Sequence, residues 1–168
     1  DDGRYLIELK GFTRFRKIRE LKTEKKYRIL EINYDDFIQD LNVARLIFES
    51  KPVLLADIGS SIDGFVSNVA SFRDIDVIDV REVTSEIPGI TFKQLDLALE
   101  LNSKNEKIYD CITCLHAIEH FGLGRYGDSI DINGHKKGIK NISKMLKNNG
   151  YLYLSTPIGR ERIEFNAN

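Results

Sequence analysis

Two glycines and two aspartates in this sequence are spaced as in a binding site for a nucleotide-type cofactor. Asp57 lies at the end of an apolar run, and Gly59 and Gly64 follow it. Glycine permits a tight turn at the first position and lets a ligand approach the backbone at the second. Asp79 ends another apolar run about 20 residues after the turn, where a ribose-binding carboxylate is typical. We therefore expect a cofactor outside the carboxyl ends of these two strands.

A histidine-rich turn supplies the candidate catalytic groups. The residues His116-Ala117-Ile118-Glu119-His120 follow the fourth predicted strand. If an acceptor hydroxyl has to lose a proton, His120 is the preferred base and Glu119 is the second candidate. The alternative, in which both side chains only order the loop by hydrogen bonding, stays open. The same residues match the H-x-x-E-H pattern of inverted zinc proteases, but that pattern belongs within a long helix, so we predict no metal site.

A glycine-rich loop after this turn carries the candidate substrate contacts. Residues 122–127 satisfy the pattern G-x-G-x-x-G. The strand-turn-helix context that a dinucleotide site requires is missing, so we expect a mobile loop instead. Loops at the carboxyl side of a sheet commonly bind substrates. The predicted substrate-binding residues are Arg125, Tyr126, Asp128 and His135.

Alternating strand and helix patterns place these groups at one edge of a sheet. Residues 35–50 carry apolar side chains at helical spacing, and Lys51-Pro52 ends that segment. The predicted order is then strand 53–58, helix 63–72, strand 76–80, strand 90–95, helix 96–103, strand 109–115, helix 135–147 and strand 151–156. Asn148-Asn149-Gly150 is predicted to cap the last helix. Repeated crossovers require a parallel sheet with helices on both faces, so we expect a doubly wound α/β fold.

Length and composition fit one domain with a charged N-terminal appendage. The chain has 168 residues, 42% of them hydrophobic, which is enough for one core. Residues 1–33 are charged and lack periodicity, so we assign them to the appendage and residues 34–168 to the domain. A net charge of -1 gives no general attraction to nucleic acid or anionic membranes. Since no apolar stretch approaches the roughly 20 residues that span a bilayer, and the acidic start is no secretory signal, we expect a cytoplasmic protein.

Cys111 and Cys114 form a C-x-x-C pattern inside an apolar strand. Positions i and i+3 of a strand face opposite sides of the sheet. The sequence also has no second cysteine pair to complete a four-thiolate zinc site. We therefore expect two buried thiols without a redox or metal role.

Taken together, these motifs resemble the class I S-adenosylmethionine-dependent methyltransferases. The resemblance extends over about residues 50–157 and rests on residues 57–64, Asp79, Asp96, residues 115–120 and residues 145–152. More narrowly, residues 119–128 resemble the signature of the DUF268 family within that superfamily. The resemblance implies a mostly parallel, Rossmann-like methyltransferase sheet.

The resemblance also implies a role for each candidate residue. The implied cofactor-binding residues are Asp57, Gly59, Ser60, Ser61 and Gly64 for the methionine moiety of S-adenosylmethionine, Asp79 for the ribose, Asp96 and Leu97 for the adenine, and Leu115 and His116 for the methyl-donor side. The implied enzyme is an O-methyltransferase for a small polar acceptor, such as a hydroxyl in bacterial surface-glycan biosynthesis. Two alternatives stay open. Ser61 replaces the usual second glycine of a Gly-x-Gly turn, which indicates a catalytically inactive binding or scaffold domain, and a similar sheet serves nucleotide-sugar or dinucleotide enzymes.

The number of strands indicates a truncated sheet. Related folds of the superfamily carry seven strands, whereas five are predicted here. We therefore expect a fragment of a longer protein or a compact variant. A sheet that ends at its fifth strand exposes an edge that another chain can pair with, which predicts a homodimer through that edge.

Overall fold

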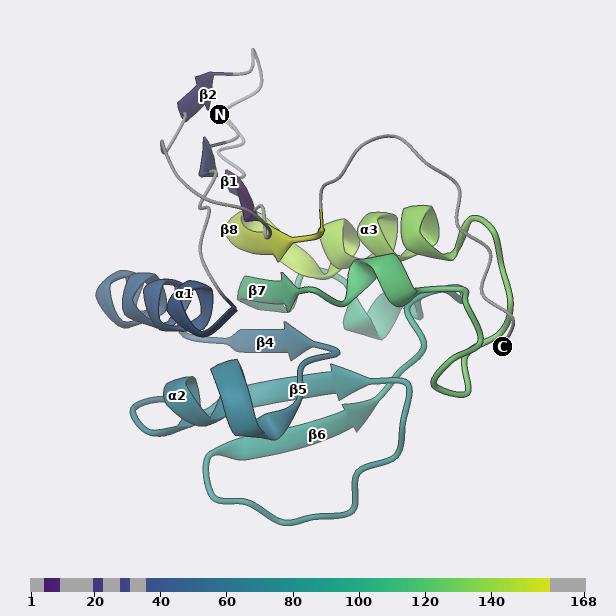
Figure 1. The fold of residues 1–168 in the computed structure, drawn as a ribbon, viewed down its shortest axis with the longest axis horizontal. Coiled ribbons are helices and arrows are strands. Elements are labelled where there is room, and N and C mark those ends of the chain that lie inside the picture. The colour runs from purple at the N-terminus through teal and green to yellow at the C-terminus, as the bar shows by residue number, and fades with distance from the viewer. Residues whose placement is uncertain (1–4, 10–19, 23–27, 31–35, 158–168) are drawn as a thin grey trace.

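The computed structural model describes residues 5–9, 20–22, 28–30 and 36–157, and the statements below concern these residues. Their main element is a six-stranded sheet in which all neighbouring strands run parallel (Figure 1). From edge to edge the strands are β1 (Tyr5–Leu9), β8 (Leu146–Ser155), β7 (Tyr109–Leu115), β4 (Leu55–Ile58), β5 (Ile75–Asp79) and β6 (Ile90–Gln94). A separate antiparallel pair consists of β2 (Glu20–Lys22) and β3 (Arg28–Leu30). The five predicted strands and the α/β fold class are confirmed.

The strand order creates a crevice in the middle of the sheet. From β4 the chain proceeds outward to β5 and β6, and then returns to the other side of β4 with β7 and β8. The connection after β4 therefore leads toward one edge of the sheet, and the connection after its neighbour β7 leads toward the other edge. In open α/β sheets, ligands bind outside the carboxyl ends of the strands at such a switch point. This order is consistent with a Rossmann-like sheet.

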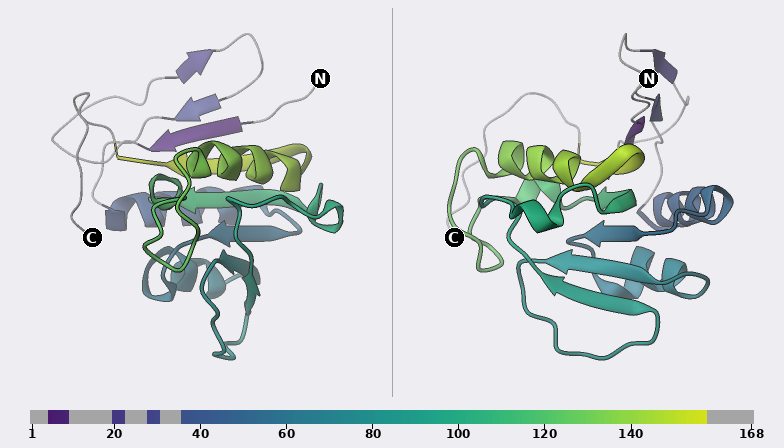
Figure 2. Two further views of the ribbon diagram at one scale, coloured as in Figure 1. Left: turned by 90° about the vertical axis from the view of Figure 1, so that its right-hand side faces the viewer. Right: turned by 180° about the vertical axis from the view of Figure 1, so that it is seen from behind.

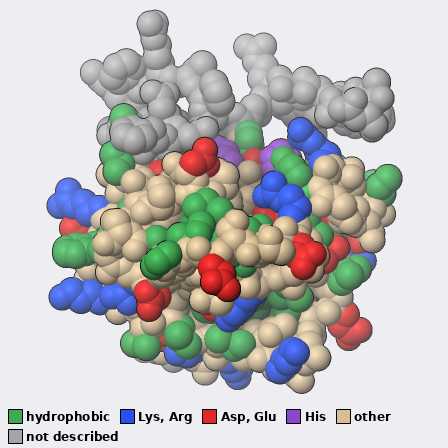
Figure 3. All heavy atoms as spheres, turned by 90° about the horizontal axis from the view of Figure 1, so that it is seen from below, with side chains coloured by type: hydrophobic (Ala, Val, Ile, Leu, Met, Phe, Trp, Pro, Cys, Tyr) green, Lys and Arg blue, Asp and Glu red, His purple; other side chains and the backbone are tan. Residues whose placement is uncertain are grey.

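Helices cover both faces of this sheet (Figures 1 and 2). On one face, α1 (Asp36–Ser50), the π-helix η1 (Ile62–Val66) and α2 (Ser67–Ala70) surround a core that includes Ile47, Phe65 and Val69. On the other face, α3 (Gly134–Met145) and the 3-10 helix η3 (Ile118–His120) pack over a second core. The side chains on one outer face of the molecule mix acidic, basic and apolar types (Figure 3).

The two cysteines of β7 lie in different cores. Cys111 belongs to the core beneath α1, and Cys114 belongs to the core beneath α3. Neither thiol has measurable exposure, and burial raises the pKa of both. The prediction of two buried thiols on opposite faces is confirmed.

The predicted helix over residues 96–103 is wrong. Only the three-residue 3-10 helix η2 (Ser103–Asn105) forms at its end. The Asp96 carboxylate accepts a hydrogen bond from the Ala98 N–H at 2.8 Å, which closes a local turn. The Asn141 amide of α3 then donates to the carbonyls of Leu97 and Leu99, at 2.8 and 2.7 Å. Because side chains satisfy these backbone groups, the segment does not need helical hydrogen bonds.

Two other predicted helix boundaries also differ. Helix α3 ends at Met145, and β8 begins at Leu146, which pairs with Tyr109 before Tyr151 pairs with Cys111. The predicted cap residues 148–150 therefore form an irregularity inside β8, where Asn149 has a φ of 65°. The predicted helix 63–72 is divided into η1 and α2, with non-helical backbone angles at Gly64.

Strand β1 comes from the segment assigned to the N-terminal appendage. It pairs with β8 over its whole length, from Tyr5 opposite Tyr151 to Leu9 opposite Ser155. The edge of β8 that was expected to be open is therefore paired, and the structure offers no support for a homodimer through it. None of the helices in the described ranges combines the length and the apolar content needed to cross a membrane.

Candidate functional site

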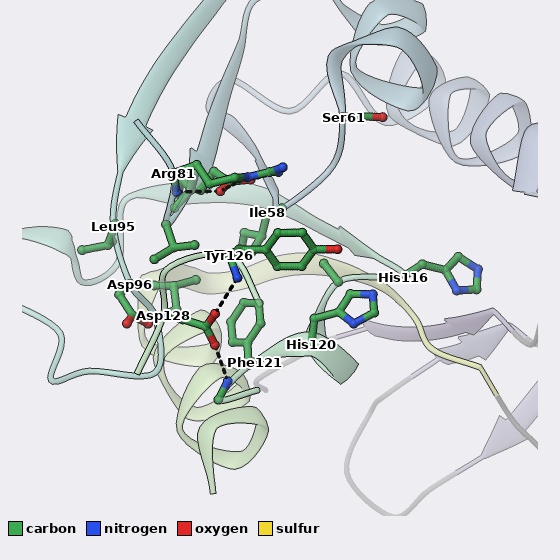
Figure 4. Close-up of a pocket in the computed structure, with 17 residues that line it drawn as sticks. Ile58, Ser61, Arg81, Leu95, Asp96, His116, His120, Phe121, Tyr126 and Asp128 are labelled. Carbon is green, nitrogen blue, oxygen red and sulfur yellow. Dashed lines mark hydrogen bonds and ion pairs between the residues drawn. The ribbon is translucent and has the colours of Figure 1, made fainter. Parts of the chain in front are cut away.

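A cavity of about 230 Å³ lies at the carboxyl ends of the central strands (Figure 4). The strand ends and the turns after them contribute Ile58, Gly59, Ser61, Ile78, Asp79, Val80, Arg81, Leu95, Asp96 and Leu97. The segment after β7 contributes His116, Ala117, His120, Phe121, Gly122, Tyr126 and Asp128. The cavity thus lies at the switch point, with strand ends on one side and the glycine-rich loop on the other.

The turn after β4 brings the backbone of Gly59 to the cavity wall. Gly59 has a φ of +76°, and its N–H donates to the Ile78 carbonyl at 2.9 Å, which connects the turn to β5. A Cβ atom at this position would lie 2.9 Å from the Cβ of Ala117. Glycine is therefore required both for the conformation and for the close approach of the two walls. Of the other turn residues, Ser61 lines the cavity, whereas Ser60 and Gly64 do not.

Asp57 lies behind this turn and not in the cavity. It is completely buried; its carboxylate accepts hydrogen bonds from the Thr113 hydroxyl at 2.6 Å and from the Ser60 N–H at 3.2 Å. Burial raises the pKa of Asp57 to about 6, although both hydrogen bonds oppose the shift. The side chain is thus placed to hold the backbone of the turn, and its role toward a cofactor stays a prediction.

Asp79 lines the cavity with only 9% of its surface exposed, and a guanidinium already binds it. Oδ1 accepts from the Arg81 backbone N–H at 2.8 Å and from Arg81 Nε at 2.9 Å, while Oδ2 accepts from a terminal Arg81 nitrogen at 2.6 Å. Burial raises the pKa of Asp79, but the hydrogen bonds and charge of Arg81 outweigh it and hold this pKa below its ordinary value.

Sequence reasoning missed Arg81. The only signal was a basic residue two positions after a strand-end acid, and such a pattern does not reveal where the side chain points. The Arg81 guanidinium carbon lies 4.9 Å from the centroid of the Tyr126 ring. Tyr126 belongs to the glycine-rich loop, so this contact joins the two sides of the cavity (Figure 4).

Three of the four residues predicted to bind the adenine or the methyl-donor side of the cofactor line the cavity. Asp96, Leu97 and His116 line the cavity. Leu115 does not, because it lies in the core beneath α1. His116 has a φ of 52°, and its Nδ1 lies 3.7 Å from Glu119 Oε1.

Of the two candidate bases, only His120 lines the cavity. Its ring meets the Tyr126 ring edge-on, with 5.8 Å between the centroids. Glu119 is partly buried next to His116, and its Oε2 has no hydrogen-bond partner among the described residues. The H-x-x-E-H residues begin directly after β7 and end with the three-residue η3, so they do not form the long helix of a zinc protease. No group of three potential metal-ligating side chains occurs in the part of the chain that the structure describes.

The glycine-rich loop is organised around the Asp128 carboxylate. This group accepts hydrogen bonds from the N–H groups of Gly122, Gly124 and Tyr126, at 3.0, 3.1 and 3.1 Å. Burial raises the pKa of Asp128, but these backbone donors outweigh it and lower the pKa. The loop therefore satisfies its own backbone donors with its own acid, which argues against a phosphate-binding role and gives no support to the expected mobility.

Two predicted substrate residues lie outside the cavity lining. Arg125 and His135 are exposed and do not line it, whereas Tyr126 and Asp128 do. Their positions after the fourth strand did not reveal that Arg125 is exposed on the loop and that His135 lies in α3. The structure thus brings together Gly59, Ser61, Asp79, Asp96, Leu97, His116, His120, Tyr126 and Asp128.

The fold and cavity define an α/β protein with a cavity at the switch point of a parallel sheet, which is where such folds commonly bind small molecules. A family model described as "Caenorhabditis protein of unknown function, DUF268" matches residues 68–168, which is more than half of the chain. The chain therefore belongs to the DUF268 family, as its loop signature predicted. No curated protein matches the chain.

Proposed function

We propose that this protein is an S-adenosylmethionine-dependent methyltransferase for a small polar acceptor. One observation carries the proposal: the cavity combines a glycine turn after the central strand with an acid at the end of the neighbouring strand. A nucleoside needs a backbone that it can approach closely and a carboxylate that accepts hydrogen bonds from its hydroxyls. Gly59 and Asp79 meet these two requirements.

The remaining walls suit an adenosyl group. Ile78, Leu95 and Leu97 offer apolar surface for a base, and Asp96 adds an acceptor at its edge. Asp79 has spare acceptor capacity on Oδ2, which takes a single hydrogen bond from Arg81. A ribose that needs both oxygens must displace the Arg81 side chain. The residues therefore fit the cofactor, at the cost of that displacement.

Positioning accounts for most of the chemistry in this proposal. S-adenosylmethionine would supply a methyl group on a sulfonium, which is already a good leaving group. The cavity residues have to align the acceptor oxygen and exclude water. His120 is the lining residue that can accept the proton of an acceptor hydroxyl, and Tyr126 fixes the orientation of its ring. Glu119 is set back from the cavity and would act only through His116.

The acceptor class follows from the resemblance and the polarity of the loop side. We assign it to a hydroxyl of a sugar-linked group in bacterial surface-glycan biosynthesis, methylated in the cytoplasm. His120, Tyr126 and Asp128 give this side of the cavity polar groups that can meet such a hydroxyl.

Isothermal titration calorimetry with S-adenosylhomocysteine tests the cofactor assignment. Wild-type protein is expected to bind it, and Asp79→Ala is expected to weaken binding by about 10- to 100-fold, the value of hydrogen bonds to a charged group. Asp74→Ala, an exposed acid just before β5, is the matched control and should bind like wild type. His120→Asn should retain cofactor affinity and lose methyl transfer. No heat at millimolar concentrations of the sulfur compound would refute the assignment, and heat with NAD instead would indicate a dinucleotide enzyme.

A catalytically inactive binding domain is the second candidate, and the pairing of Arg81 with Asp79 favours it. An ion pair that permanently blocks the ribose acceptor would leave a cavity without its main polar contact. Ser61, which replaces the usual second glycine of the turn, also favours this candidate. In that case Asp79→Ala should not change the affinity for any adenosyl compound.

A further inference from the structure

The ion pair between Arg81 and Asp79 lies in the cavity wall and occupies the carboxylate that a ribose would bind. We propose that Arg81 and Tyr126 form a latch across the cavity, which only a ligand with adjacent hydroxyl donors releases, so that Arg81 sets both affinity and selectivity. The inference rests on the proposed function, because an adenosyl group provides such a pair of hydroxyls.

The bonds that hold the latch match those that a ribose can offer. The Arg81 side chain donates two hydrogen bonds to Asp79, one to each carboxylate oxygen. A vicinal diol also carries two donors on adjacent atoms. The backbone N–H of Arg81 donates a third bond to Oδ1 that does not depend on where the side chain lies. A diol can therefore take over the two side-chain bonds while the turn after β5 remains intact.

The two partners of this ion pair differ strongly in their exposure. The Arg81 side chain is 49% exposed, whereas the Asp79 side chain is 9% exposed. If the ion pair opens, the Arg81 guanidinium moves into the solvent with little loss of free energy. The Asp79 carboxylate, however, remains inside the protein without the guanidinium. The latch consequently stays closed unless the ligand itself satisfies Asp79. A ligand of the same shape without hydroxyl donors cannot do this.

Tyr126 connects the latch to the loop that faces the acceptor side. Its ring lies against the Arg81 guanidinium on one side and meets the His120 ring edge-on. Its backbone N–H is held by Asp128, so the ring is fixed to the glycine-rich loop. Release of Arg81 removes one of the contacts that hold Tyr126 across the cavity (Figure 4). Nucleoside binding thereby frees the side of the cavity next to His120 for an acceptor.

The test compares adenosine with 2′,3′-dideoxyadenosine, which lacks both hydroxyl donors, by equilibrium dialysis at pH 7.5. Arg81→Met keeps the length of the side chain and removes its donors. Arg45→Met is the matched control, because Arg45 also binds a carboxylate, that of Glu49 on the surface of α1, far along the chain from the site. We expect Arg81→Met to bind adenosine about tenfold more tightly than wild type and to bind dideoxyadenosine as well, which the closed latch excludes from wild type, so that the preference for adenosine falls. Arg45→Met should change neither affinity.

A second measurement needs no ligand. The ¹⁵N-labelled Nε–H signal of Arg81, identified by its absence in Arg81→Met, should exchange slowly with water in wild type because Asp79 holds it. Replacing Tyr126 by alanine should accelerate this exchange, and adding adenosine to wild type should shift the signal to that of a free arginine. A fast-exchanging signal in ligand-free wild type would overturn the latch.

The outcomes separate the latch from the proposed function. Weaker adenosine binding in Arg81→Met would show that Arg81 contacts the ligand, which overturns the latch and leaves the cofactor site standing. Equal affinities of wild type for the two nucleosides would overturn the role of the diol. If neither wild type nor Arg81→Met binds adenosine or S-adenosylhomocysteine while the Nε–H signal is slow, the proposed function fails and the ion pair is a permanent structural contact.

Discussion

Substituting Gly59 by alanine should damage the site in two ways that can be measured separately. A non-glycine residue at a φ of +76° costs roughly 1–2 kcal/mol. The new Cβ would also lie 2.9 Å from the Ala117 Cβ, well inside the usual carbon contact distance of about 3.5–4.0 Å. Overpacking of this kind costs about 1–3 kcal/mol. The free energy of unfolding should therefore fall by about 3 kcal/mol in total.

Gly127→Ala is the matched control for the backbone component. Gly127 has a φ of +91°, but an added Cβ would meet nothing within 4 Å. Its substitution should thus cost only the conformational part, about 1–2 kcal/mol. Because both variants replace glycine by alanine, the changes in the unfolded chain cancel in the comparison. The difference of about 2 kcal/mol corresponds to roughly 4–8 °C in melting temperature for a chain of this size.

A double-mutant cycle identifies the partner of the contact. Urea denaturation of Gly59→Ala, Ala117→Gly and the double variant should give a favourable coupling of about 2 kcal/mol, because glycine at position 117 removes the atom that the new Cβ meets. Calorimetry should show that Gly59→Ala also weakens binding of S-adenosylhomocysteine. Equal costs for Gly59→Ala and Gly127→Ala, or a coupling near zero, would refute the argument that the two walls approach through Gly59.

Three further substitutions test side chains that hold the segments around the cavity in place. Burial raises the pKa of Asp57 to about 6, above its ordinary 3.8, so the folded state favours the protonated acid; this stabilisation is complete below about pH 4 and is lost as the pH rises through 6. The unfolding free energy of wild type relative to Asp57→Asn should therefore fall by about 3 kcal/mol between pH 4 and 7.5 in urea titrations. Asn141→Ala leaves the Leu97 carbonyl without its donor and should cost about 1–3 kcal/mol in the same assay. Asp128→Ala should accelerate hydrogen exchange of the three loop amides that it accepts by at least about tenfold, as measured by NMR.

Each of these three predictions has a control measurement or variant, or a result that would contradict it. Parallel pH profiles of wild type and Asp57→Asn would show that Asp57 does not titrate in this range. Asn148→Ala, at an exposed amide just beyond α3, should leave stability unchanged, and an equal loss there would contradict the role of Asn141. Ser129→Ala, next to Asp128 and exposed, should leave loop exchange unchanged. Loop amides that exchange equally in Asp128→Ala and wild type would mean that the carboxylate does not hold the loop.

Features that depend on nearby residues could be predicted from the sequence. The strand 109–115 was predicted with its observed bounds, because a fully buried parallel strand is a continuous apolar run between polar segments. The opposite faces of Cys111 and Cys114 follow from the alternation of side chains along a strand. The glycine turn was predicted because few residue types adopt a positive φ.

The errors occurred where distant residues decide local structure. A helix was predicted over residues 96–103, but Asn141, more than 40 residues away, binds the Leu97 and Leu99 carbonyls that would have accepted helical hydrogen bonds. Strand β1 joins the sheet through pairing with β8 at the opposite end of the chain, which no local pattern indicates. The Asp128 carboxylate likewise accepts hydrogen bonds from three loop amides, and only the folded loop brings these amides close to it.

The sequence by itself determined the α/β fold, the glycine turn and the acids at the strand ends, because periodicity and backbone freedom are properties of short segments. Only the tertiary structure decided which of these acids faces the cavity. Asp57 is buried behind the turn, while Asp79 lies in the cavity wall under the guanidinium of Arg81. The physical reason is that burial and ion pairing depend on the side chains that neighbouring strands and loops bring together, and these neighbours are far apart in the chain.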